Sequence, residues 1–187
     1  PGFMPFLLKN ANYRYETVPQ KGLNGRIGYQ PRGKGLGGSS AINAMVYIRG
    51  NRWDYDNWAD MGCTGWSYDD VLPWFKQSEA NERGGDEYHG AGGPLFVSNQ
   101  RSPNPTSHAF VEAAAELQMR TNGDFNGQQQ EGFGPMEMTV YNGRRWSTAN
   151  AYLRPALKRK NVSMVKCFAR RVIFENQRAI GVEIERG

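Results

Sequence analysis

The chain has 187 residues and a mass of 21.1 kDa, enough for one ordinary domain with a core or for two partial ones. Its 39% hydrophobic and 22% charged residues exclude a disordered or fibrous protein, and no uncharged apolar run approaches the roughly 20 residues of a membrane-spanning helix. The net charge of +5 is compatible with nucleic-acid binding, but the basic residues are dispersed and no nucleic-acid-binding motif accompanies them. We therefore expect no nucleic-acid partner.

The cysteines and the chain ends each give a further expectation about this chain. Cys63 and Cys167 are far apart and form no CxxC pair, so we expect two buried free thiols and no metal site. The chain begins with Pro1 rather than Met, and it stops at Gly187 directly after a strand-like run. We expect that it is cut from something longer.

The first third of the chain mixes irregular segments with one predicted helix. Residues 1–32 show no sustained period, so they are expected to be mostly extended and to need a neighbour to pack against. A glycine-rich turn starts at Gly33 and leads into a buried helix expected at 40–48, where apolar residues recur at helical spacing after a serine that can cap. Residues 50–65 are polar and aromatic-rich, which predicts an ordered excursion over a surface.

The middle of the chain carries start signals for two helices. Ser67 followed by Asp70 is a capping box and predicts a helix to about Asn81, which an internal proline should bend. A short strand is predicted at 94–98. Pro105 then opens a second helix.

The last third is expected to change to β structure. Alternation at 134–140 predicts a strand, and a short helix capped by Ser147 is predicted to follow. Three β-rich runs, at 162–166, 170–174 and 179–185, predict an antiparallel meander.

The most informative stretch is PRGKGLGGSSAINAMVYIRGNRWDYDNW, residues 31–58. Gly33, Gly35 and Gly38 satisfy GxGxxG, and a glycine turn that opens a helix can present backbone N–H groups to a phosphate. The dinucleotide fingerprint follows a buried strand, whereas the preceding GRIGYQPR is polar, and no lysine follows the paired glycines as in a P-loop. From the residues alone, an anion site and a purely structural glycine turn stay equally open.

Over GKGLGGSSAINAMVYIRG the chain resembles the signature of the glucose-methanol-choline (GMC) oxidoreductases. The resemblance covers nearly the entire chain, most closely in the manner of choline dehydrogenases and related bacterial alcohol dehydrogenases. It continues through NYRYET, WSYDDVLPWFKQSE, YHGAGGPLFV, GFGPMEMTV, GRRWSTANAYLRPA and RAIGVEIE.

The resemblance implies an α/β fold class, α+β within this piece, with part of a FAD/NAD(P)-binding domain interleaved with part of a substrate domain. Residues 1–50 are expected to belong to the FAD-binding domain and 51–93 to a lid or excursion. Residues 94–155 are expected to form part of the substrate domain, and 156–187 to return to the FAD-binding domain as a β-meander.

The function that the resemblance implies is oxidation of an alcohol, choline or another aliphatic or aromatic primary alcohol, with hydride passing to N5 of FAD and oxygen or a quinone as electron acceptor. The family's catalytic histidine lies near the C-terminus, and neither His89 nor His108 matches it. Both are expected to be structural or surface residues, so the chain alone should be inactive.

Two alternatives from other classes are a stand-alone, non-catalytic flavin-family binding module and a basic nucleic-acid-binding protein. Any ordered form of the isolated chain is expected to depend on self-association or on retained antiparallel elements. No signal peptide or transmembrane segment is recognisable in the chain, so we expect a location in the cytoplasm or peripheral to the inner membrane.

The family pattern places the cofactor contacts mainly in the signature. Asn43 is singled out because its amide can both donate and accept hydrogen bonds. Ile42 stands where some members have a histidine that bonds covalently to the flavin, so non-covalent FAD is expected. The expected cofactor contacts are Gly37, Gly38, Ser39, Asn43, Ala44, Val46 and, through its main chain near the adenine, Ala169.

Overall fold

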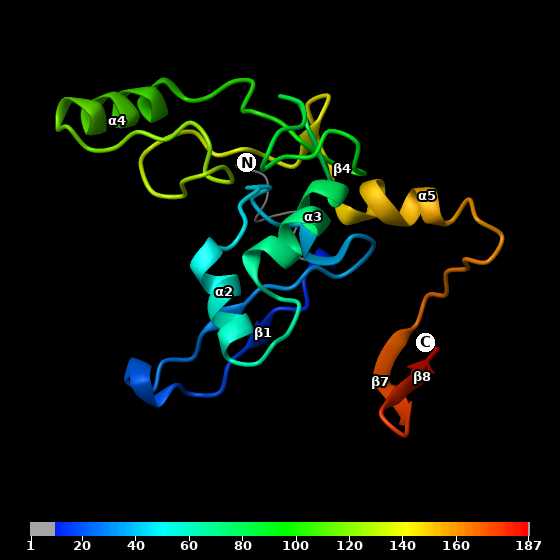
Figure 1. The fold of residues 1–187 in the computed structure, drawn as a ribbon. Coiled ribbons are helices and arrows are strands. Elements are labelled where there is room, and N and C mark those ends of the chain that lie inside the picture. Colours follow the sequence, from blue (N-terminus) through cyan, green and yellow to red (C-terminus); the bar gives the residue numbers. More distant parts are fainter. Residues whose placement is uncertain (1–9, 187) are drawn as a thin grey trace. The chain divides into compact units, whose positions relative to one another are not determined.

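The computed structural model describes residues 10–186 (Figure 1), and contacts divide the chain into two compact units, Pro1–Leu153 and Arg154–Gly187. Both units mix helical segments with short strands. Within the described residues every sheet has two strands: β1 with β2, β3 with β4 and β5 with β6 in the first unit, and β7 with β8 in the second.

The first described segment is extended, as predicted. Strand β1 (Tyr15–Glu16) pairs antiparallel with β2 (Tyr29–Gln30), and a 3-10 turn, η1 (Lys21–Leu23), lies between them. The Asn12 carboxamide joins the two arms, because its Oδ1 accepts a hydrogen bond from the backbone N–H of Arg32 at 2.9 Å. Residues 1–9 lie outside the described part of the chain.

The buried helix predicted at 40–48 is wrong. Only one turn of 3-10 helix forms, η2 (Gly38–Ala41). The side-chain oxygen of Asn43 accepts the backbone N–H of Met45 at 3.1 Å, and Met45 adopts a positive φ of 66°. Both features divert the backbone from helical geometry, and Val46 then makes a β-bridge with Met138.

Helix α2 (Arg52–Asp60) lies in the segment 50–65, which was predicted to be an ordered excursion over a surface and not a helix. Its start is a capping box: Asn51 Oδ1 accepts the N–H of Trp53 at 3.0 Å, and Asp54 Oδ2 accepts the N–H of Asn51 at 2.8 Å. The pattern Asn-x-x-Asp is the counterpart of the Ser-x-x-Asp signal recognised further along the chain. It could have predicted this helix.

Helix α3 (Tyr68–Ser78) confirms the capping box of Ser67 and Asp70. It ends three residues before Asn81, where the prediction placed its end. The reason is that Glu79–Asn81 forms strand β3 instead.

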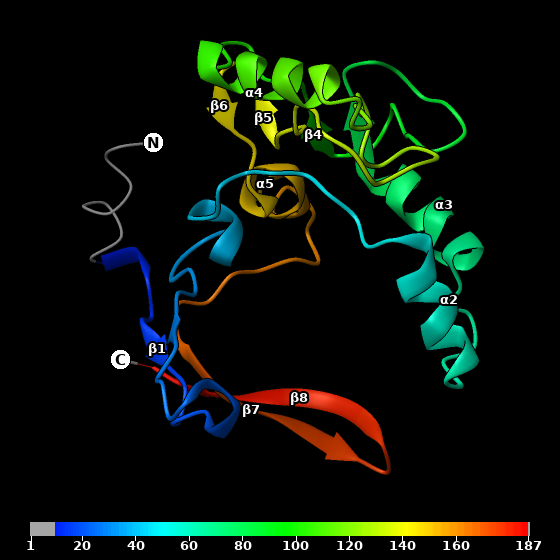
Figure 2. The same cartoon turned by 90° about the vertical axis from the view of Figure 1, so that its left-hand side faces the viewer.

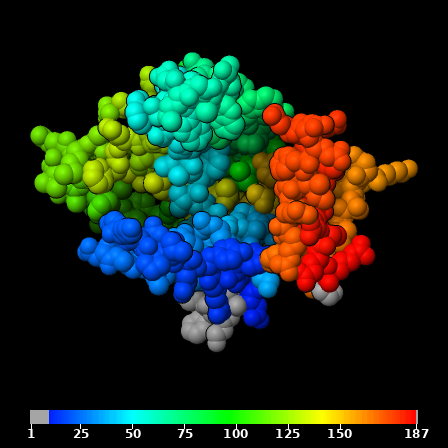
Figure 3. Space-filling model, turned by 90° about the horizontal axis from the view of Figure 1, so that it is seen from below, coloured from blue at the N-terminus to red at the C-terminus, as the bar shows by residue number. Residues whose placement is uncertain are grey.

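Aromatic side chains join α2 to α3. The ring of Tyr55, which is buried, lies 5.8 Å from that of Phe75 and 6.3 Å from that of Tyr68, centroid to centroid. The opposite faces remain exposed, with Trp53 and Trp74 each 69% accessible. Figure 3 shows the residues of α2, in cyan, at the surface.

Strand β3 pairs in parallel with β4 (Leu95–Val97), which confirms the strand predicted at 94–98. The segment that joins β3 to β4 contains no helix. It passes close to the end of α3. A Cβ on Gly90 would lie 1.8 Å from the carbonyl oxygen of Lys76. Only glycine allows this approach of two backbones.

Helix α4 (Pro105–Glu116) confirms the predicted helix at Pro105. The strand predicted at 134–140 forms only in part, as β5 (Val140–Tyr141), which pairs antiparallel with β6 (Arg144–Arg145). Figure 2 shows β4, β5 and β6 next to one another.

The short helix predicted after Ser147 is present as a π-helix, η3 (Ala149–Leu153). It begins with hydrogen bonds from the N–H groups of Asn150 and Ala151 to the carbonyl oxygen of Ser147. The second unit opens with a single turn, α5 (Arg154–Ala156).

The second unit consists mainly of a hairpin of β7 (Phe168–Glu175) and β8 (Arg178–Glu185). Asn176 and Gln177 join the strands with φ values of 46° and 68°, the left-handed pair of a two-residue hairpin turn. The three-stranded meander is wrong, because residues 162–166 pair with neither strand. Every residue of both strands is exposed.

Polar residues dominate the interior of the first unit. Its buried hydrophobic side chains are few and mostly small: Tyr55, Tyr68, Val97, Ala114, Ala149 and Ala151. The fully enclosed part of this unit is therefore built around hydrogen bonds and charges. Its buried polar residues are Asn12, Arg49, Glu79, Asn81, His89, Ser98, Asn126, Glu137 and Ser147.

The expectation of buried thiols is wrong, since Cys63 and Cys167 are both free and exposed. Cys63 lies in the turn that follows α2, and Cys167 directly precedes β7, so neither reaches the interior. Among the described residues, no helix is both long enough and apolar enough to cross a lipid bilayer.

Candidate functional site

The glycine-rich segment at 33–46, called the signature loop below, folds back on itself. A Cβ on Gly33 would lie 2.0 Å from the carbonyl oxygen of Gly38, so these two backbones are in direct contact. Ser39 Oγ accepts the N–H of Gly33 at 3.1 Å and holds the same closure. The loop is therefore a compact turn with a defined shape.

Part of this turn presents bare backbone. Gly35 and Gly38 have φ values of +124° and +51°, and a Cβ on either would meet no atom within 4 Å. Ser39, Asn43 and Ala44 are exposed beside them. Open glycine faces next to a hydroxyl and an amide fit a ligand with phosphate and ring-carbonyl oxygens, because such a ligand needs close access to N–H groups.

The guanidinium of Arg145, in β6, holds the loop from 102 residues away. Its Nη1 donates to Oδ1 of Asn43 at 2.7 Å, to the carbonyl oxygen of Asn43 at 2.8 Å and to that of Ser40 at 3.1 Å. Burial lowers the pKa of the Arg145 guanidinium, which still stays charged in a protein.

Thr148 completes this attachment. Its N–H donates to Ser40 Oγ at 3.0 Å, and its hydroxyl donates to the carbonyl oxygen of Gly37 at 3.2 Å. Ser40 Oγ in turn donates to the same Gly37 carbonyl at 2.5 Å. We call Arg145 and Thr148 the bracket; neither residue was predicted from the sequence to lie at this site.

The structure brings six of the seven expected cofactor residues together in the signature loop. Val46, at the end of the loop, is 42% exposed, and Ile42 is half-buried. The seventh, Ala169, lies in β7 of the second unit and is exposed. The six loop residues are Gly37, Gly38, Ser39, Asn43, Ala44 and Val46.

A second polar cluster lies in the interior of the first unit. Arg49 Nη2 donates to Glu79 Oε2 at 2.6 Å, with both side chains at most 3% exposed. His89 lies between two carboxylates: Nδ1 is 3.1 Å from Glu79 Oε1, and Nε2 is 2.9 Å from Asp124 Oδ2. Arg83 lies 2.9 Å from Glu137 Oε1. We call this group the buried charge cluster.

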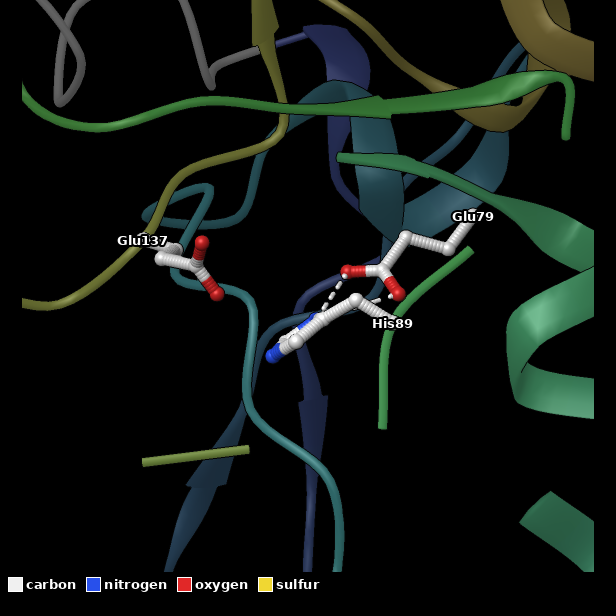
Figure 4. A group of neighbouring side chains, drawn as sticks. All are labelled: Glu79, His89 and Glu137. Carbon is white, nitrogen blue, oxygen red and sulfur yellow. Dashed lines mark hydrogen bonds and ion pairs between the residues drawn. The ribbon is translucent and has the colours of Figure 1, made fainter. Parts of the chain in front are cut away.

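Glu79, His89 and Glu137 place ligand atoms close enough to hold a metal ion (Figure 4). The amide nitrogen of Asn81, however, lies 3.0 Å from Glu79 Oε1, 2.9 Å from Glu137 Oε1 and 3.2 Å from His89 Nδ1. It contacts all three ligand atoms and so takes the place that a cation would take. The two hydrogens of this amide go to Glu79 and Glu137, and its nitrogen lies beside Nδ1 of His89, so the arrangement is a hydrogen-bond network.

The positive and negative charges of this cluster are equal in number when His89 is protonated. Burial lowers the pKa of His89, but hydrogen bonds to Glu79 and Asp124 outweigh it, so the net pKa is raised. Burial raises the pKa values of Glu79 and Asp124, yet hydrogen bonds, from His89 above all, bring both below their ordinary values. With His89 protonated, the positive groups Arg49, Arg83 and His89 match the negative groups Glu79, Asp124 and Glu137.

His89 is thus a buried structural residue, one of the two roles that the sequence analysis expected for it. His108 is exposed on α4. Because both ring nitrogens of His89 are engaged by carboxylates, this side chain has no free position for a substrate.

The comparisons with known proteins concern almost the whole chain. The family model described as GMC oxidoreductase matches residues 7–187. Two curated relatives are the oxygen-dependent choline dehydrogenases of Brucella anthropi, 51% identical, and of Sinorhizobium medicae, 50% identical. Each match covers 98% of this chain and 33% of the relative, so the chain spans about a third of the length of these relatives.

Solved structures show the same fold. Pyridoxine 4-oxidase from Mesorbium loti is 33% identical with a TM-score of 0.87, over 98% of this chain and 37% of that one. The FAD-dependent oxidoreductase from Chaetomium thermophilum is 27% identical with a TM-score of 0.75, over 91% of this chain and 32% of that one. Formate oxidase from Aspergillus oryzae, at 22% identity and a TM-score of 0.80 over 97% of this chain and 33% of that one, shares the fold.

Proposed function

The chain belongs to the GMC oxidoreductase family, and we propose that it supplies part of the FAD site of a flavin-dependent oxidoreductase acting on the CH–OH group of an alcohol. The observation that carries this proposal is the signature loop, which presents open glycine backbone beside a hydroxyl and an amide. FAD, when bound, would supply the acceptor for the hydride of the alcohol carbon. The residues of this chain bind and orient it.

Each loop residue has a role in this proposal. Gly37 and Gly38 give the backbone close access to the cofactor. A side chain on Gly38 would stand in that open space, whereas a Cβ on Gly37 would lie 3.2 Å from Ser147 Oγ, so glycine there lets the loop pack against Ser147. Ser39 and Asn43 offer polar groups, and the small side chains of Ala44 and Val46 pack against the ring system. In the second unit, the main chain of Ala169 approaches the adenine.

The FAD is held without a covalent bond. Ile42, between the bracketed Ser40 and Asn43, carries a hydrocarbon side chain that offers no nucleophile to the flavin. Binding therefore depends on hydrogen bonds and packing, and the cofactor should be released when the protein is unfolded.

The substrate is a primary alcohol, choline or another aliphatic or aromatic alcohol, with oxygen or a quinone as electron acceptor. Support comes from relatives whose names describe oxygen-dependent choline dehydrogenases and a pyridoxine 4-oxidase. Neither histidine of the chain is suited to remove the hydroxyl proton, because His89 is enclosed and His108 lies on an exposed face of α4. The chain by itself should therefore not oxidise an alcohol.

The proposed domain division is FAD-binding at 1–50 and 156–187, lid at 51–93 and substrate domain at 94–155. The hairpin of the second unit supports part of it, because a two-stranded sheet with every residue exposed is marginally stable alone and gains from joining a larger sheet. Exposed strand edges would also promote self-association of the isolated chain. We propose a location in the cytoplasm or peripheral to the inner membrane.

The test is to purify the naturally encoded protein that contains this chain and to record its visible spectrum, its FAD content and its oxygen uptake with choline, benzyl alcohol and pyridoxine. We expect flavin absorption, release of free FAD after acid precipitation and uptake with at least one alcohol. Flavin that stays with the acid precipitate would contradict the non-covalent site. Bound FAD without turnover of any alcohol would favour a non-catalytic binding module, and absence of FAD would reject the proposal.

A further inference from the structure

We infer that Arg145 is a positioning residue that fixes the side-chain amide of Asn43, so that Asn43 meets the bound cofactor only as a hydrogen-bond donor. The inference rests on the proposed FAD site and goes beyond it. An asparagine amide can in general either donate or accept. Here Arg145 occupies the amide oxygen, so only the donating nitrogen of the amide faces the ligand.

The orientation of the Asn43 amide follows from its partners. The side-chain oxygen receives Nη1 of Arg145 at 2.7 Å and the backbone N–H of Met45 at 3.1 Å. Guanidinium and backbone N–H groups are donors only, so the atom that they share must be the oxygen. A flipped amide would point its own N–H groups at two donors.

The nitrogen of the same amide is left for a ligand. Among the described residues, no group makes a hydrogen bond with Nδ2 of Asn43, and the side chain is exposed. The open face of Gly38 lies in the same loop. A ligand here would be held by the two N–H bonds of this nitrogen, and its own group must be an acceptor, such as a flavin ring carbonyl or a phosphate oxygen.

Arg145 is suited to this task because a single nitrogen makes three contacts with the loop. Nη1 also donates to the carbonyl oxygens of Ser40 and Asn43, so the backbone and the side chain of Asn43 are fixed together. Hydrogen bonds from a charged donor are about twice as strong as neutral ones. Loss of the guanidinium would therefore free both the loop and the amide.

The sharpest test changes the amide itself. Asn43→Asp keeps an oxygen for Arg145 and Met45 but replaces the outward nitrogen with a second oxygen, which faces the acceptor of the ligand. Asn43→Ala removes both groups without adding an opposing one. We expect the dissociation constant for FAD to rise about tenfold in Asn43→Ala and further in Asn43→Asp.

The second series changes the bracket. Arg145→Met should weaken FAD binding about tenfold or more and shift the visible absorption bands of the flavin, while Arg145→Lys should restore part of both, since all three contacts come from one nitrogen. Arg144→Met is the matched control, because Arg144 is exposed in the same strand and makes no hydrogen bond to the described loop residues. It should leave both readouts unchanged.

All variants are made in the naturally encoded protein, stripped of flavin and titrated with FAD. Asn43→Asp binding FAD as tightly as the wild type, or Arg145→Met leaving affinity and spectrum unchanged, would overturn the inference. If Arg145→Met does not fold, the order of the two Asn43 variants decides, since the Asn43 side chain is exposed and both variants lie outside the buried interior. A wild type that binds no FAD instead rejects the proposed function.

Discussion

The Nε2 atom of His89 lies 2.9 Å from Oδ2 of Asp124, a residue 35 positions further along the chain. The other ring nitrogen faces Glu79 at 3.1 Å. This imidazole is therefore held between two carboxylates inside the buried charge cluster. Its charge should control the stability of the first unit.

Stability should fall at alkaline pH. Because the folded pKa of His89 is raised, its contribution is fully present below the unfolded value of about 6.5 and is lost as pH rises through the folded value. Thermal unfolding monitored from pH 6 upward should show this decline, and His89→Gln should lack it. His108→Gln, at an exposed position, should keep the wild-type profile; an unchanged profile in His89→Gln would contradict the assignment.

Acid should destabilise the same cluster for the opposite reason. The pKa values of Glu79 and Asp124 are below normal in the folded state, so their contribution is present above the unfolded values of about 4 and is lost as pH falls through the folded ones. Urea denaturation at decreasing pH should show a falling midpoint below about pH 4. Asp124→Asn should flatten that decline, and a midpoint insensitive to acid in the wild type would count against this account.

The buried ion pair of Arg49 and Glu79 should be costly to break from one side. Arg49→Met leaves an enclosed carboxylate without its guanidinium, and we expect a loss of about 3–5 kcal/mol in the free energy of unfolding, measured with urea. Arg101→Met is the control, because that arginine is 76% exposed in its pair with Glu82 and should cost less than about 1 kcal/mol. Equal losses in the two variants would show that burial does not set the cost.

Gly90→Ala should destabilise the loop that joins β3 to β4. Its new Cβ would meet the carbonyl oxygen of Lys76 at 1.8 Å, so two backbones must move apart, at a cost of at least about 1–3 kcal/mol. Gly92→Ala, two residues on, meets nothing within 4 Å and should change stability by less than about 0.5 kcal/mol. Thermal melts of the two variants measure this difference in stability. Equal melting temperatures would show that the loop is loosely packed.

Gly33→Ala should weaken FAD binding although Gly33 itself is not a proposed contact. A Cβ there would lie 2.0 Å from the carbonyl oxygen of Gly38, so the signature loop could not close on itself. We expect the dissociation constant for FAD to rise about tenfold or more, whereas Gly22→Ala, in open space, should bind normally. Fluorescence titration with FAD measures both; normal binding by Gly33→Ala would mean that this closure does not shape the site.

The sequence alone was sufficient where the relevant interactions are local. The capping box at Ser67, the proline start at Pro105 and the family signature are each contained within a few neighbouring residues, and the structure and the family match confirm them. The Asn51 capping box of α2 was equally local and was missed. The six loop residues of the proposed cofactor site lie close together for the same reason, because they are neighbours in the chain.

Contacts between distant parts of the chain determine the features that were not predicted from the sequence. Nothing near Ser40 predicts that Arg145 will hold its carbonyl oxygen from 105 residues away, or that Arg145 rather than Arg144 points toward the loop. The helix expected at 40–48 fails because an asparagine side chain and a bridge to Met138 compete for its backbone groups. Local pattern fixes which residues can form a turn or a helix, whereas hydrogen bonds across the tertiary structure decide which of these conformations leaves the fewest buried polar groups unsatisfied.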